Sequence, residues 1–456
     1  MERELYPLTA AQNILFYSQK YSFQKQINNV ATLLLIEEDI DIEIFKSALL
    51  KSYERIDALR LRITKHEGSV MQYFLDKEQP EMHYLNLSGK NPEEVDAVFN
   101  KLASKRVTHF DKPLSRVFFL ENCNGMKGIF FIVSHLILDS WGICNFFKDV
   151  MSVYEAMAKG GEYPKAPYAY KDLMLQELNY RNTPQYIKDR EYWINEFSPT
   201  NEPIFTHLNG SKVLDKVRKK KKNPLYRRAT SLSFLSFASQ EILLIPKDMV
   251  DKMKLFCSEH RLPVQTLIML AYRSFISKIN RREKDILFYT VLARRGTLAE
   301  KSSGGSRVYF LPFRTILDES TTFKDSLEML AEKQSSIYKH SAINPLENMG
   351  IITKAYNKKP TEAYASGSLT FQPIPIVHPN GAKIHSKWYC NGASSNYFYM
   401  TVMDDDGSGA LRFYYEYKKT IVSVESIREL HSYMLKFIET GLNNKDITIG
   451  ELLSLE

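Results

Sequence analysis

Apolar and polar residues alternate along this chain with two different periods, and each period predicts its own kind of element. Apolar side chains at Ile42, Phe45, Leu49 and Tyr53 recur at helical spacing, which predicts a helix with one face packed inward. The same spacing predicts helices at residues 10–20, 143–158, 249–260, 264–279, 323–338 and 421–442. Runs rich in β-branched and aromatic residues predict strands at residues 30–36, 117–120, 128–133, 283–291, 307–316, 397–402 and 411–417. Because strand and helix signals alternate in both halves, the predicted fold class is α/β (α+β).

The length of the chain predicts two lobes. Its 456 residues exceed what one ordinary hydrophobic core accommodates. We place an N-terminal lobe at residues 1–180 and a C-terminal lobe at residues 181–456. The sequence between residues 209 and 230 is strongly basic, and this stretch is predicted to be a linker or an exposed loop.

The most informative stretch follows the predicted strand at residues 128–133. Ile129 to Val133 are consecutive apolar residues, which predicts a buried strand that ends beside His135. A side chain at the exit of such a strand is held by a rigid scaffold and faces an open loop. A histidine there is more often structural than chemical, but it exchanges a proton near neutral pH, so His135 is the candidate catalytic residue. Asp139 would lie on the following turn, where it can pair with a base and hold the loop.

Charge and cysteine usage narrow the classes of function. The net charge is +8, and much of it lies between Lys216 and Arg228. Since no nucleic-acid-binding motif accompanies this run, we interpret it as a solvated surface and expect no nucleic-acid partner. The cysteines are far apart, so we expect free thiols in a reducing compartment and no metal site. A charged N-terminus and the lack of an apolar run of about 18 residues predict a cytoplasmic protein without a membrane partner.

Residues 134–142, Ser-His-Leu-Ile-Leu-Asp-Ser-Trp-Gly, resemble the His-His-x-x-x-Asp-Gly-Trp-Ser signature of the condensation domains of nonribosomal peptide synthetases. These domains belong to the chloramphenicol-acetyltransferase-like superfamily. Weaker matches follow the family's order at residues 6–12, 55–63, 110–116, 170–173, 292–295 and 305–314. Each is unspecific alone, and their order and spacing together carry the resemblance.

The resemblance implies two chloramphenicol-acetyltransferase-like lobes that form a V, with the active site in the cleft between them. It implies an acyltransferase that forms an amide, or an ester, in nonribosomal peptide or related natural-product biosynthesis. The donor would be an acyl or aminoacyl thioester on the phosphopantetheine arm of an acyl or peptidyl carrier protein, and the acceptor a small-molecule amine. No cofactor is expected to be bound, because the substrates arrive on carriers or on coenzyme A.

The resemblance also assigns site residues. His135 would act on the acceptor amine, either as a general base or by positioning it. Asp139 would be structural and pair with Arg295 of the other lobe, with Arg294 as an alternative partner. Support of the site is assigned to Ser134, Ser140, Trp141 and Gly142. A possible substrate channel is assigned to Tyr309 and Gln372. A weaker carrier-binding surface, suited to an acidic carrier, is assigned to Lys219, Lys220, Lys221 and Lys222.

Two departures from the family signature bear on the activity. Ser134 stands where the family has its first histidine, which is mainly structural there, so a hydrogen-bonding serine is tolerable. Ser140 replaces a glycine that supplies a positive φ or room for the thioester arm, which suggests an altered donor geometry. Ser140 is not expected to be a nucleophile, since the chain lacks a Gly-x-Ser-x-Gly elbow. The Gly-Gly-Ser at residues 304–306 weakly resembles a carrier attachment site, but a strand-like run follows it instead of a helix.

Other functions remain open at this point. A coenzyme A-dependent acyltransferase of the same superfamily would use His135 in a similar way. A non-catalytic docking module is a further alternative, although such relatives often lose the histidine or the aspartate, and this chain keeps His135 and Asp139. An epimerase role is a minor one. The initial methionine and the early first motif favour a free-standing protein.

Overall fold

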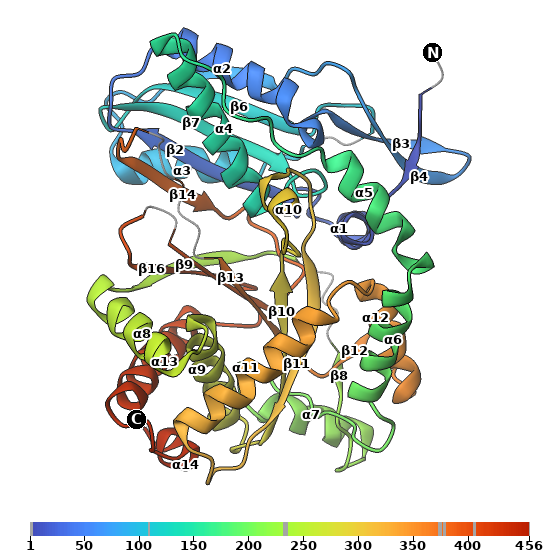
Figure 1. Ribbon diagram of the computed structural model, residues 1–456. Helices are drawn as coiled ribbons and strands as arrows, with labels where there is room; N and C mark the ends of the chain where they lie inside the picture. Colours follow the sequence, from blue (N-terminus) through green and yellow to red (C-terminus); the bar gives the residue numbers. More distant parts are fainter. Residues whose placement is uncertain are drawn as a thin grey trace.

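The computed structural model describes residues 3–107, 110–230, 236–372, 376, 380–404 and 407–455. The chain folds into two halves, each built around one large sheet (Figure 1). In the first half the strand order is β14-β2-β7-β6-β5, and in the second it is β11-β10-β13-β15-β16-β9. The mixed α/β fold class predicted from the sequence is confirmed.

The sheet of the first half is covered on both faces. Its strands are β2 (Asn29–Ile36), β5 (Glu81–Asn86), β6 (Ser115–Cys123), β7 (Met126–Ser134) and β14 (Ile384–Tyr389). Helices α2 (Ile42–Arg55) and α4 (Ser140–Lys159) pack on one face, and α3 (Pro92–Ala103) packs on the other. Phe131 of β7 packs in the core under α2 and α4, and Phe130 packs in the core under α3. Because both faces of β7 are covered, the strand is apolar without alternation. A smaller sheet with the order β1-β4-β3 lies beside it, made of β1 (Tyr6–Pro7), β3 (Leu61–His66) and β4 (Ser69–Phe74).

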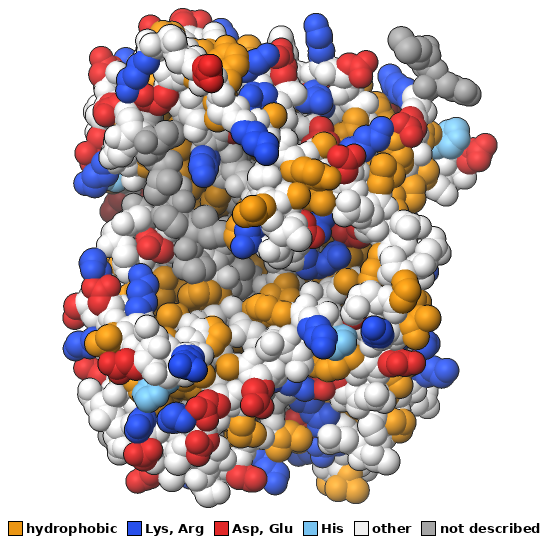
Figure 2. Space-filling model, viewed as in Figure 1, with side chains coloured by type: hydrophobic (Ala, Val, Ile, Leu, Met, Phe, Trp, Pro, Cys, Tyr) orange, Lys and Arg blue, Asp and Glu red, His pale blue; other side chains and the backbone are white. Residues whose placement is uncertain are grey.

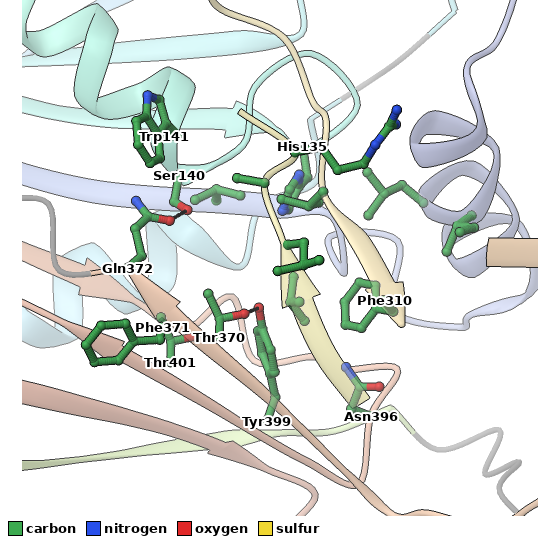
Figure 3. Close-up of a pocket in the computed structure, with 18 of the residues that line it drawn as sticks. His135, Ser140, Trp141, Phe310, Thr370, Phe371, Gln372, Asn396, Tyr399 and Thr401 are labelled. Atoms are coloured by element: carbon green, nitrogen blue, oxygen red, sulfur yellow. Dashed lines mark hydrogen bonds between the residues drawn. The ribbon is translucent and has the colours of Figure 1, made fainter. Parts of the chain in front are cut away.

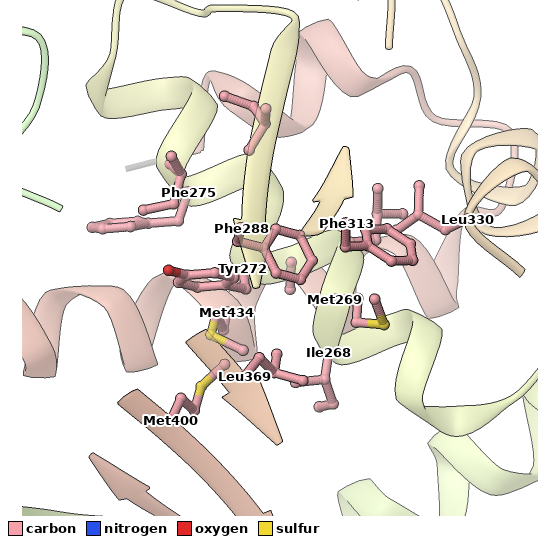
Figure 4. Close-up of a cluster of buried hydrophobic side chains, with 14 of the residues drawn as sticks. Ile268, Met269, Tyr272, Phe275, Phe288, Phe313, Leu330, Leu369, Met400 and Met434 are labelled. Atoms are coloured by element: carbon pink, nitrogen blue, oxygen red, sulfur yellow. The ribbon is translucent and has the colours of Figure 1, made fainter. Parts of the chain in front are cut away.

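The sheet of the second half has one core face and one open face. Its strands are β9 (Ser239–Ile245), β10 (Asp285–Leu292), β11 (Tyr309–Ile316), β13 (Gly367–Gln372), β15 (Phe398–Met403) and β16 (Leu411–Tyr417). Leu369 of β13 and Met400 of β15 lie beside Ile268 of helix α9 (Val264–Ile279) in the largest core (Figure 4). The core is completed by α8 (Lys247–His260), α11 (Phe323–Lys339), α13 (Val424–Asn443) and α14 (Ile449–Leu453). The opposite face of this sheet borders the space between the two halves.

The remaining helices and strands lie outside the two large sheets. They are α1 (Ala10–Tyr21), η1 (Asp57–Arg60), α5 (Tyr170–Asn179), η2 (Tyr180–Asn182), α6 (Pro184–Glu196), α7 (Lys212–Lys221), β8 (Ala229–Thr230), α10 (Leu298–Ser302), α12 (Pro345–Ala355) and β12 (Glu362–Ala363). Strands β8 and β12 pair with each other. In the described part of the chain, no helix combines the length and the apolar content that a membrane span needs. All four cysteines are free and buried.

Two features of the fold differ from what the sequence patterns suggested. The loop or linker predicted at residues 209–230 is wrong in part, because residues 212–221 form α7. Its apolar residues pack in a small cluster with Phe205 and Ala229, which pins the helix to the second half. Strand β14 leaves the second half and pairs antiparallel with β2, with Ile384 opposite Ile36 and Tyr389 opposite Ala31. The boundary at residue 180 stays a prediction. Because β14 comes late in the sequence but belongs to the sheet of the first half, no single boundary in the sequence separates the two halves.

Candidate functional site

His135 stands where β7 ends, at the junction of the two halves. Its backbone N–H donates to the carbonyl oxygen of Asn28 at 2.7 Å, which fixes the chain as it leaves the strand. Its ring Nδ1 lies 3.3 Å from Oγ of Ser306, which comes from the second half. The histidine predicted from the sequence is therefore held by both halves, and the sequence reasoning did not identify Ser306 as its partner.

The surroundings of His135 favour its neutral form. Burial lowers the pKa of the imidazole below its ordinary value, and the nearby carboxylate of Asp139 opposes this shift in part. At neutral pH the ring therefore keeps an unprotonated nitrogen, which is the form that accepts a proton or a hydrogen bond from an amine.

Asp139 is the anchor of the loop that follows His135. It caps helix α4, where its Oδ1 accepts the N–H of Gly142 at 2.8 Å, a favourable place for a negative charge. Nη2 of Arg295 lies 2.9 Å from Oδ1 and 3.1 Å from Oδ2, and Oδ2 also accepts the N–H of Arg307 at 3.0 Å. Both side chains of the ion pair are 1% exposed. The predicted pairing of Asp139 with Arg295 is confirmed.

Arg295 extends this anchor to the segment that precedes β11. Its Nη1 donates to the carbonyl oxygens of Glu300 and Ser303 at 2.6 and 2.9 Å. Its Nη2 is also within 3.2 Å of the carbonyl oxygen of Gly304 and 3.1 Å of that of Gly305. Residues 295–307 of the second half are thus clamped against the start of α4 in the first.

Trp141 and two glycines complete the contact between the halves. Nε1 of Trp141 donates to the carbonyl oxygen of Lys301 at 2.8 Å. A Cβ on Gly142 would lie 2.9 Å from Cδ2 of Leu138, so only glycine fits without a shift. Gly305 has φ +86° and a Cβ there would lie 2.0 Å from the ring of Tyr170. The Gly-Gly-Ser considered as a carrier attachment site is thus part of the contact between the halves, with Ser306 beside His135.

The two serines that depart from the family signature have different surroundings. Ser134 is buried at the end of β7, and its N–H donates to the carbonyl oxygen of Leu114 at 2.8 Å. Ser140 is the first residue of α4, and it is not among the described residues with a positive φ, so its backbone does not require glycine. Its hydroxyl donates to Oε1 of Gln372 on β13, which brings a side chain of the second half across the cavity.

Arg294 and Tyr309 form a pair of their own, away from Asp139. The guanidinium of Arg294 lies 4.1 Å from the centre of the Tyr309 ring and 3.1 Å from the carboxylate of Glu177. The hydroxyl of Tyr309 donates to the same carboxylate at 2.9 Å. Tyr309 is buried and is not part of the cavity wall that the described residues form, although Val308 and Phe310 are. The channel role predicted for Tyr309 is therefore not supported, since the strand alternates and turns its side chain away.

A cavity of about 890 Å³ lies between the halves and contains His135 in its wall. The surface is hollowed there (Figure 2). Ser140, Trp141 and Gln372 also line the cavity, with Asn28 of the first half and Thr370 and Tyr399 of the second. Figure 3 shows His135 above the strands that carry Thr370, Tyr399 and Gln372. Among the residues that the structure describes, no group of three or more His, Cys, Asp or Glu side chains is arranged to hold a metal ion.

The predicted carrier-binding lysines lie elsewhere. Lys219, Lys220 and Lys221 are exposed on the last turn of α7, and Lys222 follows in the left-handed conformation. In Figure 1, α7 lies at the end of the second half that is remote from the first half. These lysines therefore do not border the cavity.

Comparison with known proteins agrees with this arrangement. The sequence profile of the family described as "Condensation domain" matches residues 2–456. A plipastatin synthase of Bacillus subtilis (strain 168) is 23% identical over 99% of this chain, which covers 17% of that protein. Surfactin synthase subunit 1 of the same strain is 21% identical over 99% of this chain, which covers 12% of that protein. The chain thus spans less than a fifth of the length of these relatives.

Solved structures show the same fold. The first condensation domain of the calcium-dependent antibiotic synthetase, in complex with substrate analogue 3a, aligns with a TM-score of 0.81 at 16% identity over 98% of each chain. The starter condensation domain of rhizomide synthetase, in complex with C8-CoA, aligns with a TM-score of 0.81 at 16% identity over 99% of this chain and 97% of that one.

Proposed function

This chain belongs to the condensation-domain family, and we propose that it joins an acyl or aminoacyl thioester on a carrier protein to an acceptor amine. The observation that carries the proposal is the position of His135, which lies in the wall of a cavity shared by both halves and is held by Ser306 of the opposite half. Such a cavity can admit a donor and an acceptor and exclude bulk water around the reacting atoms.

The proposed reaction forms one bond and breaks another. The amine nitrogen attacks the thioester carbonyl, the C–N bond forms, and the C–S bond breaks to release the thiol. A proton leaves the nitrogen and is returned to the sulfur, so the balance requires no further reactant. For Nε2 of His135 to take this proton, Nδ1 carries the ring hydrogen and donates it to Oγ of Ser306. The lowered pKa of His135 keeps the ring in this neutral form.

The Asp139–Arg295 pair supports this role indirectly. Its contacts are to the backbone of residues 142, 300, 303–305 and 307. It holds the loop after His135 against the segment that supplies Ser306, so we assign it a positioning role. Placement of this kind contributes a large part of the rate in reactions between two bound substrates.

A coenzyme A thioester is a second candidate donor, because a structural relative binds C8-CoA in the matching fold. Either donor presents its acyl group on a phosphopantetheine thiol, so the same cavity and the same His135 would serve. A docking module without catalysis would not need the neutral, doubly held histidine that this cavity contains.

A single-turnover assay followed by intact-protein mass spectrometry tests the proposal. Carriers loaded with different acyl and aminoacyl groups, and the matching coenzyme A thioesters, are offered with a panel of amines. Amide product from carriers supports the proposal, and product from coenzyme A thioesters alone assigns the second candidate. Carrier binding without any turnover contradicts both and indicates a docking module.

Carrier binding by Lys219–Lys222 remains a weaker proposal, because α7 is remote from the cavity. Changing these four lysines to glutamate would weaken binding of an acidic carrier, most strongly at low salt, if the carrier docks there. Unchanged binding would place the carrier elsewhere on the surface.

A further inference from the structure

The open face of the second sheet forms the floor of the cavity, and alternation along its strands decides which side chains it presents. Thr370 of β13, Thr401 of β15 and Tyr414 of β16 line the cavity. Neighbours along the strands such as Leu369, Met400 and Phe413 point to the opposite face, into the core. Thr370 and Tyr399 are hydrogen-bonded to each other at 2.6 Å, as Figure 3 shows. The floor is therefore a mixture of hydroxyl groups and aromatic rings.

Glu416 is the exception on this floor. It lies on β16 opposite Tyr399 of β15 and Gln240 of β9, and all three residues line the cavity. Its carboxylate has no hydrogen bond or ion pair with any residue that the structure describes. Burial raises the pKa of this carboxyl to about 7, because no positive charge compensates for the lost hydration. In such surroundings the ionised carboxylate is stabilised by any cation that enters the cavity.

Apart from Lys339, the other charged groups of the cavity wall are already engaged. Asp189 accepts hydrogen bonds from Tyr180 and Gln185 and pairs with His340. Glu300 pairs with Arg307 at 2.7 Å. The two arginines of the wall pair with Glu177 and Asp139. Lys339 is exposed at the end of α11 and forms no ion pair with Glu416. Glu416 is thus the acidic group in the described wall that is left for a ligand.

We propose that Glu416 binds a positively charged group of a substrate, an ammonium or guanidinium, while the reacting end of that substrate lies at His135. This inference rests on the proposed condensation function and assigns a substrate class to it. Hydrogen bonds from a cation to a half-buried carboxylate are charge-assisted, and the tyrosines of the floor offer aromatic faces to the same group.

The sheet register separates Glu416 from Gln372 on the floor of the cavity. Gln372 marks the end of the floor that contacts the loop after His135, and Ser368 lies four residues earlier on β13. Tyr399 is opposite Ser368 and Glu416 is opposite Tyr399. Four residues along a strand span about 13 Å, and two strand spacings span about 10 Å. Glu416 therefore lies well apart from Gln372, and a substrate that contacts both residues must extend across the floor.

Kinetics with a matched substrate pair test the inference. Carriers loaded with lysine or with 2-aminoheptanoic acid differ only in an ammonium group in place of a methyl group. Each is offered as donor and as acceptor to the wild type, to Glu416→Gln and to the control Glu241→Gln. Glu241 lies on β9, where it pairs with Arg428 at 2.8 Å, and it is not part of the cavity wall. We expect the wild type and the control to prefer lysine by about tenfold or more in kcat/KM. In Glu416→Gln this preference should disappear.

Calorimetry with the amide analogues of the two thioesters keeps the test independent of turnover. Tighter binding of the lysine analogue to the wild type, lost in Glu416→Gln, supports the inference even if no substrate reacts. Equal binding of both analogues to the wild type, or a lysine preference that survives in Glu416→Gln, overturns it. Absence of turnover with all substrates would instead count against the proposed condensation.

Discussion

The buried ion pair between Asp139 and Arg295 gives the strongest stability prediction. In Asp139→Asn the shape is kept but the negative charge is lost, which leaves the guanidinium of Arg295 buried among backbone carbonyls. Both side chains are 1% exposed, so water cannot replace the lost partner. Removing one member of such a pair costs about 3–5 kcal/mol of unfolding free energy. The double variant Asp139→Asn, Arg295→Gln should cost clearly less than the sum of the two single variants, because no unpaired charge remains.

Urea unfolding followed by far-UV circular dichroism and tryptophan fluorescence measures these costs. Trp141 donates to the carbonyl oxygen of Lys301, so its emission also reports the contact between the halves. Asp318→Asn is the matched control, because Asp318 pairs with Lys284 at 3.4 Å with both side chains more than 60% exposed. Loss of an exposed pair should cost less than about 1 kcal/mol. If Asp139→Asn costs no more than this control, the pair does not hold the halves together.

Three further results are expected. Since burial lowers the pKa of His135 below its ordinary 6.5, an NMR titration of its imidazole, assigned by its absence in His135→Ala, should have its midpoint below 6.5; a midpoint at or above 6.5 contradicts the account. Ser140→Gly removes the hydrogen bond to Gln372 and opens the cavity, so unfolding free energy should change by no more than about 1 kcal/mol while competition assays show relatively faster turnover of bulky donors. KM for a lysine-loaded carrier should rise as the pH falls below 7 and Glu416 becomes protonated, whereas KM for the 2-aminoheptanoic acid carrier should not rise. Tyr399 and Cys390, which face Glu416, have pKa values raised to about 12, so both stay neutral throughout this pH range.

Periodic elements of the fold were predictable, and long-range pairing was not. The helical spacing at residues 42–53 and the apolar run of β7 identify their elements, because burial of one or two faces dictates the residue types. In α7 the lysines outnumber the apolar residues, so the composition did not indicate that the segment forms a helix with a short apolar face. No local pattern shows that β14 crosses to pair with β2, since strand exchange depends on contacts more than 300 residues apart.

The site was predictable where one motif carries it. His135, Asp139 and Arg295 follow from resemblance to the family, and the ion pair between the last two is present. Ser306 was not identified as a partner of His135, because the two are 171 residues apart. Glu416 was also missed, although a glutamate among the aromatic residues at 413–417 was a signal that the sequence contained.

The measurement that tests the central claim most directly is the single-turnover rate of amide formation in the wild type and in His135→Ala, with the same loaded carrier and amine. Binding of the carrier to each protein is measured in parallel. Because His135 lies in the wall of the shared cavity and is held neutral there, we expect the variant to bind the carrier as the wild type does and to form amide at least about 100-fold more slowly. An equal rate in the two proteins would contradict the assignment of His135.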